Sequence, residues 1–399
     1  MNKQPVVYRE VKDTKGFYWL LAFFGALCAI GFSSFLYLEH EGHYVTGMNN
    51  QIVWGLPHVF AIFLIVAASG ALNVGSIGTV FRKKAYQPLG RLSALLAISL
   101  LIGGLIVLVL DLGHADRLII AMTYYNFKSI FAWNIILYNG FLVLSAFYIW
   151  TMMDRKIKAA YQYAGAAAFG WRLILTMGTG SIFGFLVARQ FYDAAIMAPL
   201  FIAMSFSLGL AVFILVLFAS YKGTGRELGD GIVNRLRYLL AIFIGAVLFL
   251  ELVRHLSNLY ATEHHGIELF ILRDGGIYTQ LFWVVQIFLG SLVPLSLIFC
   301  KFFAGNRLSL IIAAALVIVG GLAQVYVILI GGQAYPLVLF PGAEVESTFF
   351  DGVLNSYSPS IWEIMLGIGG VGLALLMVTI GVKVLRFLPE SLADEVVES

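Results

Sequence analysis

The sequence predicts an all-α protein that crosses a membrane about ten times. Of its 399 residues, 60% are hydrophobic and only 12% are charged, and the mean hydropathy is +0.91. Soluble domains carry about 25% charged residues, so a soluble globular fold is excluded. The apolar runs are continuous and long, whereas the strands of a membrane barrel are short and alternate in polarity. Helices are therefore the predicted spanning elements.

Ten apolar stretches are long enough to cross a bilayer. They cover residues 17–38, 54–81, 92–111, 129–152, 160–187, 194–221, 236–259, 277–302, 308–331 and 359–387. We expect one membrane domain over 17–387, between a tail at 1–16 and a tail at 388–399. The first stretch is too long for a signal-peptide core and lacks a small-residue cleavage site, so we expect it to be retained. We expect the chain to lie in a lipid bilayer and to have no nucleic-acid partner.

The distribution of charge predicts the orientation. Most of the 25 lysines and arginines flank the stretches on the side of the two termini, and loops rich in these residues stay in the cytoplasm. All seven histidines fall near the opposite, outer side. Outer acids and loop histidines such as EHEGH and EHHGIE also fit an ordinary surface. The long outer connection at 332–358 fits a partner-docking loop, a site cap or a plain surface loop.

A group of polar residues ends the third stretch, in LVLDLGHADR. Charged groups this close to a membrane interior are costly. In an α-helix Asp111 and His114 would share a face, so a carboxylate and an imidazole could exchange a proton there. The alternative is an ordinary helix end with Gly113 as its C-cap. We favour a functional role because Asp111 lies on the apolar side of that glycine.

A second group, ELVRH, lies near the outer end of the seventh stretch. Glu251, Arg254 and His255 are spaced at i, i+3 and i+4 and therefore share a helix face. They fit either an internal ion pair or an acid–base relay beside a buried ligand. The recurrence of such groups on two helices at similar depth favours the relay. Arg172, a lone charge in the fifth stretch, either extends to the cytoplasmic surface or pairs with an acid.

No metal-based redox centre is expected within the chain. Cys28 and Cys300 lie in apolar stretches, so Cys-ligated iron–sulfur clusters and covalently attached haem are excluded. The histidines do not show the spacing of b-type haem ligands, which come in pairs on two facing helices at two depths. His58 follows Pro57, which can kink a helix, and a lone helical histidine is more often structural.

Three segments resemble motifs of the polysulfide-reductase membrane-subunit family, also called NrfD- or PsrC-like. In order they are WGLPHVFAIFLIVAASGA, LVLDLGHADR and LELVRHLSNLY. The likeness covers most of the chain from about 50 to 390, and the ten stretches and the orientation agree with it. Within the family the chain is most similar to DsrP-type subunits of complexes linked to dissimilatory sulfite reductase. It is also similar to the HybB-type subunits of hydrogenases.

The resemblance implies two four-helix bundles with flanking helices, no resident cofactor, and a quinone site near the outer surface. It implies an extracytoplasmic ferredoxin-like iron–sulfur subunit as the partner, with a multihaem cytochrome c and further redox subunits as additional ones. By the same resemblance His58 lines the quinone site, and Asp111 and Arg117 lie beside it.

One departure from the family concerns Gly178, which stands where several relatives carry His or Tyr. Thr179 or Ser181 could supply the missing hydroxyl, or the quinone site could be altered or lost.

We therefore expect a quinol- or quinone-reacting subunit of a respiratory complex in sulfur metabolism, in the bacterial cytoplasmic membrane. Quinone chemistry needs an apolar slot, a hydrogen-bond partner at each carbonyl and a titratable group nearby. The expected residues around menaquinone or ubiquinone are His58, Arg117, Thr179, Ser181, Arg189 and Arg254. The expected proton carriers are Asp111, His114, Glu251 and His255.

Two other functions compete with this expectation. A secondary transporter also has many spans and a few buried charges, but its ion ligands lie near the midplane, whereas the ionisable groups here gather toward one surface. A structural anchor for redox subunits would need no quinone site at all.

Overall fold

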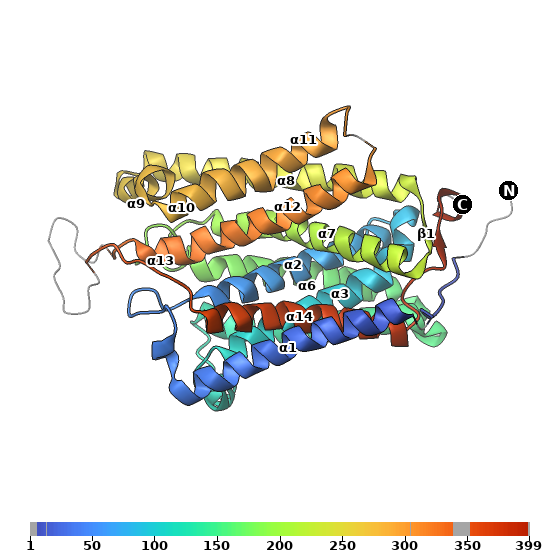
Figure 1. The fold of residues 1–399 in the computed structure, drawn as a ribbon, viewed down its shortest axis with the longest axis horizontal. Coiled ribbons are helices and arrows are strands. Elements are labelled where there is room, and N and C mark those ends of the chain that lie inside the picture. Colours follow the sequence, from blue (N-terminus) through green and yellow to red (C-terminus); the bar gives the residue numbers. More distant parts are fainter. Residues whose placement is uncertain (1–5, 13, 304, 338–351, 398–399) are drawn as a thin grey trace.

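The computed structural model describes residues 6–12, 14–303, 305–337 and 352–397. Its helices lie side by side along one long axis (Figure 1). In this described part nine helical segments are long and apolar enough to cross a membrane. They are Lys15–Glu41, Leu56–Thr79, Lys84–Leu110, Ile130–Met153, Met197–Thr224, Asp230–Tyr260, Ile277–Phe299, Arg307–Ala334 and Ile361–Val384. The predicted class, an all-α polytopic membrane protein, is confirmed.

The expected stretch at 160–187 also forms a helix, α6 (Tyr161–Gly184), of 24 residues. It is not among the nine apolar segments, because it carries Arg172 and many small residues. It packs against α5 (Ile130–Met153) and α7 (Met197–Thr224), which are two of the nine. The tenth expected element is therefore present as a helix that packs against two of the nine segments.

The remaining bounds complete the chain order. The other helices are α1 (Lys15–Glu41), α2 (Leu56–Thr79), α3 (Gly90–Leu110), α4 (Leu118–Thr123), α8 (Asp230–Tyr260), α9 (His265–Leu269), α10 (Ile277–Gln280), α11 (Val293–Phe299), α12 (Arg307–Tyr326), α13 (Gly332–Ala334), α14 (Ile361–Val384) and α15 (Asp394–Val397). Short 3₁₀ segments are η1 (His43–Val45), η2 (Lys84–Leu89), η3 (Ala115–Arg117), η4 (Arg155–Ala160) and η5 (Thr262–His264). Wider π turns form η6 (Phe270–Asp274), η7 (Leu281–Leu292) and η8 (Val327–Gly331). The strands β1 (Glu227–Leu228) and β2 (Ser391–Leu392) pair in parallel.

The long helices form two groups of four. In the first bundle α2, α3, α5 and α6 pack around one another, and in the second α7, α8 and α12 pack with the rod made of α10, η7 and α11. Helices α1 and α14 pack together and flank the first bundle, where α14 contacts α2 and α3. The two four-helix bundles with flanking helices that the family resemblance implies are therefore present.

The two bundles meet where α2 crosses α7. A Cβ atom placed on Gly70 would overlap the backbone carbonyl of Ser205, and one on Gly209 would overlap the backbone of Gly70 and Ala71. Small residues allow this approach of two helix backbones, which a lipid environment favours through close packing. Helix α2 is accordingly the most buried of the nine apolar segments.

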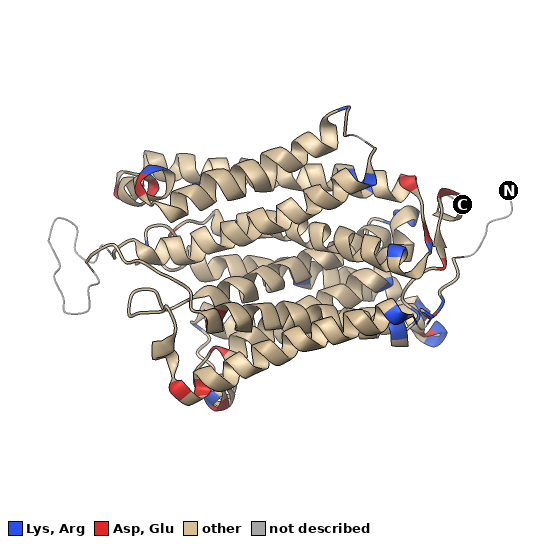
Figure 2. Ribbon diagram, in the orientation of Figure 1, with Lys and Arg blue, Asp and Glu red and all other residues tan. Residues whose placement is uncertain are grey.

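The two ends of the molecule differ in charge. Figure 2 shows most Lys and Arg at the end that holds both termini, here called the termini end, and most Asp and Glu at the other, here called the acidic end. At the termini end Arg226 donates hydrogen bonds to the carbonyls of Leu388 and Pro389 in one tail and of Arg9 and Glu10 in the other. The cytoplasmic location of the termini end stays a prediction from the positive-charge rule.

The crossing of α2 and α7 predicts the effect of a single methyl group. Gly209→Ala forces a Cβ into backbone that cannot move aside, so we expect a loss of about 1–3 kcal/mol, as for other overpacked sites. Gly223→Ala on the same helix is the matched control, because nothing lies within 4 Å of a Cβ at that position. Thermal unfolding of both purified variants in one detergent measures the difference. Equal melting temperatures would contradict the close approach.

Candidate functional site

A cavity of about 470 Å³ lies inside the first bundle near the acidic end. Helices α2, α3, α5 and α6 form its walls, and α4 covers it with Leu118 and Met122. Most of the lining side chains are aliphatic or aromatic, and the polar ones are His58, Asn134, Tyr138, Asn139 and Thr179. This size and composition are typical of a site for a small, largely apolar ligand.

His58 and Asp111 are brought together at the edge of this cavity. Leu56 and Pro57 begin α2, so His58 lies in its first turn, and Asp111 directly follows the last residue of α3. The imidazole Nδ1 lies 2.8 Å from a carboxylate oxygen of Asp111, whose side chain is fully buried. The angle is not that of a hydrogen bond, and both Asp111 oxygens lack a hydrogen-bond partner among the described residues. Buried carboxylates without a hydrogen-bond partner are rare. A ligand or bound water in contact with both Asp111 and His58 would supply the missing partner.

The opposite wall is formed by Asn134 on α5 and Thr179 on α6. The Asn134 amide donates to the carbonyls of Ile130 (2.9 Å) and Gly178 (3.1 Å), while its Oδ1 is buried without a partner in the described structure. The Thr179 hydroxyl donates to the Leu175 carbonyl at 3.0 Å. A Cβ at Gly178 would overlap the end of the Leu137 side chain, which would have to move aside. An amide oxygen therefore lies where the sequence showed only a missing His or Tyr.

The cavity opens through an apolar rim. Leu112, Met122 and Phe131 line it and are 50%, 39% and 45% exposed. In a membrane-spanning protein such side chains face lipid rather than water. A ligand with a long apolar tail could therefore extend from the cavity into the bilayer.

The loop before α2 positions Trp54, which also lines the cavity. Gln333 of α13 accepts hydrogen bonds from the backbone amides of Val53 (3.0 Å) and Trp54 (3.1 Å) and donates to the Trp54 carbonyl (3.1 Å). Arg189 donates to the carbonyls of Gln51 (2.7 Å) and Gln333 (3.0 Å), and burial lowers the pKa of Arg189 from the ordinary arginine value. The second bundle thus fixes one wall of the cavity in the first.

A tyrosine and a glutamate hold the start of α2 from the other side. Tyr357 accepts a hydrogen bond from the Leu56 amide (2.7 Å) and donates to Glu363 (2.5 Å), which also accepts from the Gly47 amide (2.8 Å). Burial and the bond to Glu363 raise the pKa of Tyr357 well above its ordinary value. The hydroxyl therefore remains a neutral donor, and the backbone that carries His58 is held in place.

A second cluster of buried polar groups lies in the second bundle. Arg254 is fully buried and donates two hydrogen bonds to Glu251, at 3.1 and 3.2 Å. Gln286, in the π turns of η7, donates to the same carboxylate at 2.8 Å, and Gln324 lies 3.5 Å from it. The side-chain amide oxygen of Gln286, Oε1, has no partner in the described part of the chain. The internal ion pair, the alternative to a relay in the sequence analysis, is therefore present within a larger network.

His255 extends this network to a second carboxylate. Its Nδ1 lies 2.6 Å from Glu268 of α9, which also accepts a hydrogen bond from Asn258 at 2.7 Å. The Arg254 guanidinium approaches the other imidazole nitrogen at 3.2 Å. Two carboxylates, an arginine and a histidine thus share one buried site, which can hold and redistribute protons.

The connection from α6 to α7, residues 185–196, lies between the cavity and this second cluster. Tyr192 stacks near Trp54 and packs against Phe183 of the cavity wall. The preceding residue, Phe191, lies under the Arg254 guanidinium at 4.3 Å and near the His255 ring. The two polar sites are therefore separated by one short segment.

Other predicted site residues lie apart from the cavity. Helix α3 ends at Leu110 and Gly113 adopts a φ of 72°, so the expected helical face shared by Asp111 and His114 does not form. His114 is exposed and lies 3.7 Å from the exposed Asp116, and Arg117 is also exposed.

Three further residues predicted to bind the quinone do not line the cavity: Ser181, Arg189 and Arg254. Arg172 is fully buried and donates to Asn73 at 2.8 Å, and its Nε has no partner in the described structure. Neither an acid partner for Arg172 nor an extension to the surface is seen within the described residues. Most of the acidic part of the connection at 332–358 falls on residues 338–351, outside the described residues.

Sequence reasoning missed several residues of both sites. Asn134, Gln286, Gln324 and Gln333 are uncharged, and nothing in their local sequence marks them. Glu268 belongs to the motif EHHGIE, which also fits a plain surface loop, so its contact with His255 was not predicted. Among the described residues no three His, Cys, Asp or Glu side chains gather as metal ligands.

These features define an integral membrane protein with a ligand-sized cavity at one end of a four-helix bundle and a buried ionic network in a second bundle. Comparison with known proteins identifies the family. The chain belongs to the polysulphide reductase NrfD family, which matches residues 44–336. The resemblance noted in the sequence is thereby confirmed.

Three curated relatives match over nearly their full length. The Hdr-like menaquinol oxidoreductase integral membrane subunit of Archaeoglobus fulgidus is 28% identical, over 98% of this chain and 99% of its own. The C subunit of selenate reductase from Mesobacillus selenatarsenatis is 25% identical, over 90% and 91%. The putative membrane C subunit of dimethyl sulfoxide reductase from Halobacterium salinarum is 24% identical, over 91% and 89%. All three names describe subunits of oxidoreductases.

The ionic network predicts a large effect of removing one carboxylate. Glu251→Ala leaves the buried Arg254 without its partner, so we expect a loss of about 3–5 kcal/mol, as for other broken buried pairs. Glu251→Gln keeps an acceptor and should lose less. Glu263→Ala is the control, because the Glu263 side chain is 76% exposed. Thermal unfolding in detergent ranks the three variants, and an Ala variant at position 251 as stable as the one at 263 would contradict the network.

Proposed function

We propose that this chain is the quinol- or quinone-reacting membrane subunit of a respiratory complex. The observation that carries the proposal is the cavity of about 470 Å³ with His58 on its wall and the buried Asp111 behind it. The name of the Archaeoglobus relative, a menaquinol oxidoreductase subunit, supports this function.

The lining residues suit a quinone head group. The apolar walls accept the flat ring, and the rim at Leu112, Met122 and Phe131 leads its isoprenoid tail toward lipid. His58 and Asn134 lie on different helices of the cavity. The His58 ring nitrogen can pair with one ring oxygen in either the quinone or the quinol form, and the Asn134 Oδ1 can accept a hydrogen bond from the other hydroxyl of the quinol. The Thr179 hydroxyl, which donates to the Leu175 carbonyl, offers a further acceptor on the same wall as Asn134.

The proposed proton chemistry involves His58 and Asp111. Oxidation of a quinol releases two electrons and two protons, and reduction of a quinone takes up the same number. His58 turns Nδ1 toward Asp111, which leaves Nε2 to accept a proton from the ligand or to donate one to it. Asp111 stabilises the imidazolium that forms when Nε2 is protonated. The Glu251–His255 cluster is proposed as a second proton reservoir near the same end.

The electrons are proposed to pass to or from a partner at the acidic end, proposed to face the outside. A ferredoxin-like iron–sulfur subunit is the proposed partner, with a multihaem cytochrome c as a further one. We place the complex in the cytoplasmic membrane, in a DsrP-type assembly of sulfur metabolism. Menaquinone is favoured over ubiquinone by the name of the Archaeoglobus relative alone.

Substitutions of the two central residues test the proposal. His58→Ala removes a hydrogen-bond partner, and we expect binding of a short-chain quinone analogue to weaken by about tenfold. Asp111→Asn keeps the shape but removes the charge that stabilises the His58 imidazolium, and quinol oxidation by the assembled complex should fall by about 100-fold, since general acid–base catalysis contributes that much or more. Calorimetric titration of the purified chain and turnover of the complex are the two measurements.

The control for Asp111→Asn is Asp116→Asn, five residues further on, where the side chain is 75% exposed. It should bind and turn over like the unchanged protein. Unchanged binding and turnover in His58→Ala and Asp111→Asn would overturn the proposal and favour a structural anchor or a transporter.

The rim of the cavity gives a second, independent test. Leu112→Trp should fill the opening and weaken binding of a long-chain quinone more than that of a tail-free analogue, because only the former needs the path to lipid. Leu256→Trp, on the exposed face of α8 (55% exposed), is the control for an added lipid-facing indole. Equal loss for both ligands in Leu112→Trp would contradict the proposed tail path.

A further inference from the structure

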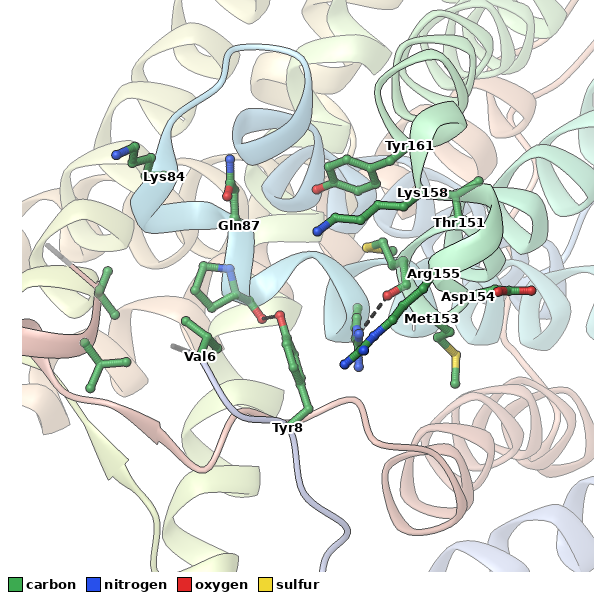
Figure 3. Close-up of a pocket in the computed structure, with 15 residues that line it drawn as sticks. Val6, Tyr8, Lys84, Gln87, Thr151, Met153, Asp154, Arg155, Lys158 and Tyr161 are labelled. Atoms are coloured by element: carbon green, nitrogen blue, oxygen red, sulfur yellow. Dashed lines mark hydrogen bonds between the residues drawn. The ribbon is translucent and has the colours of Figure 1, made fainter. Parts of the chain in front are cut away.

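A second large cavity lies at the termini end of the first bundle, far from the site described above. It measures about 750 Å³ and is formed by η2, η4 and the adjoining ends of α3, α5 and α6 (Figure 3). Both chain tails also line it, with Val6 and Tyr8 from one and Val396 and Val397 from the other. The cavity is thus open to the surface and bordered by the tails.

The lining is strongly basic. It includes Lys84, Arg91, Arg155 and Lys158 but only one carboxylate among the described residues, Asp154. That carboxylate caps η4 by accepting a hydrogen bond from the Lys156 amide at 2.9 Å, and Figure 3 shows it directed away from Arg155. Four cations therefore line one cavity, and no acid of the described residues neutralises them.

The arginine at the base of this cavity is held by neutral groups. Arg91 donates hydrogen bonds to the carbonyls of Arg386 (2.8 Å) and Met152 (2.7 Å), and its guanidinium lies 3.8 Å from the centre of the Tyr8 ring. Burial raises the pKa of Tyr8 to about 12, so this neighbour is neutral. No ion pair joins any of the four cations to an acid within the described parts of the chain. Within the described residues no acid offsets their mutual repulsion, and an anion in the cavity would reduce it.

The depth of the cavity indicates which anion. Trp150 near the end of α5 is 56% exposed, and Tyr163 at the start of α6 is 81% exposed. Exposed Trp and Tyr at helix ends mark the level of the lipid head groups. The neighbouring Met153 lines the cavity and is itself 41% exposed. The basic cavity and the head-group layer thus meet at the same helix ends.

We propose that this cavity binds the phosphate head group of an anionic phospholipid from the leaflet at the termini end. Basic pockets between transmembrane helices on the cytoplasmic side suit such head groups. Arg155 and Lys158 bind the phosphate from η4, and Lys84 binds it from η2. Since both tails line the same cavity, the bound lipid also bridges the tails to the first bundle.

The test compares lipids and variants of the full chain in detergent. Native mass spectrometry measures binding of dioleoyl phosphatidylglycerol, with dioleoyl phosphatidylcholine and inorganic phosphate as the other two probes. Phosphatidylglycerol should bind saturably and more tightly than phosphatidylcholine. The double variant Arg155→Gln with Lys158→Gln should weaken this binding by about tenfold or more.

The matched control is Lys12→Gln with Lys222→Gln, which removes two exposed charges at the same end that do not line the cavity. It should bind phosphatidylglycerol like the unchanged chain. If the first double variant does not fold, Lys84→Gln with Lys158→Gln tests the same cavity through η2.

Three results would overturn the proposal. They are equal binding of the two lipids, equal loss in the control and cavity variants, and binding of inorganic phosphate as tight as that of phosphatidylglycerol. The last result would identify a site for free phosphate instead of a lipid.

Discussion

The backbone contact between α2 and α7 is the constraint on which the rest of the molecule depends. At Gly70 and Gly209 no side chain separates the two helices, so the distance between the two bundles is set by main-chain atoms alone. Helix α2 carries His58 into the cavity, and α7 follows the connection that separates the cavity from the Glu251 cluster. A wider crossing would move both sites relative to each other.

Polar side chains fix the acidic end in a way that apolar packing could not. Apolar surfaces can slide in lipid, whereas a buried hydrogen-bond group has a required direction and a cost if it is left unpaired. Gln333, Tyr357 and Arg189 bind backbone groups of the loop before α2 from three other parts of the chain. The cavity is therefore defined by hydrogen bonds that originate mostly outside its own bundle.

The helices and the depth of the charged residues could be predicted from the sequence, because continuous apolar runs and positive charge near helix ends have direct physical causes. The pairing of His58 with Asp111 could not, since helical spacing relates only residues of one helix and these lie on two. The expected face shared by Asp111 and His114 failed because α3 ends at Leu110, before the chain reaches either residue. Gln286 was unpredictable for another reason: it lies in the π turns of η7 and its partner Glu251 lies on a different helix, α8.

The adjacent residues Phe191 and Tyr192 face opposite bundles, one toward Arg254 and the other toward Trp54. The order of these two residues in the chain therefore determines which ring contacts Arg254 and which contacts Trp54. Inserting a single residue just before them would put the Phe191 ring in the position of Tyr192, and deleting one would put the Tyr192 ring in the position of Phe191. This segment is expected to tolerate changes of side chain far better than changes of length, although surface connections ordinarily tolerate both.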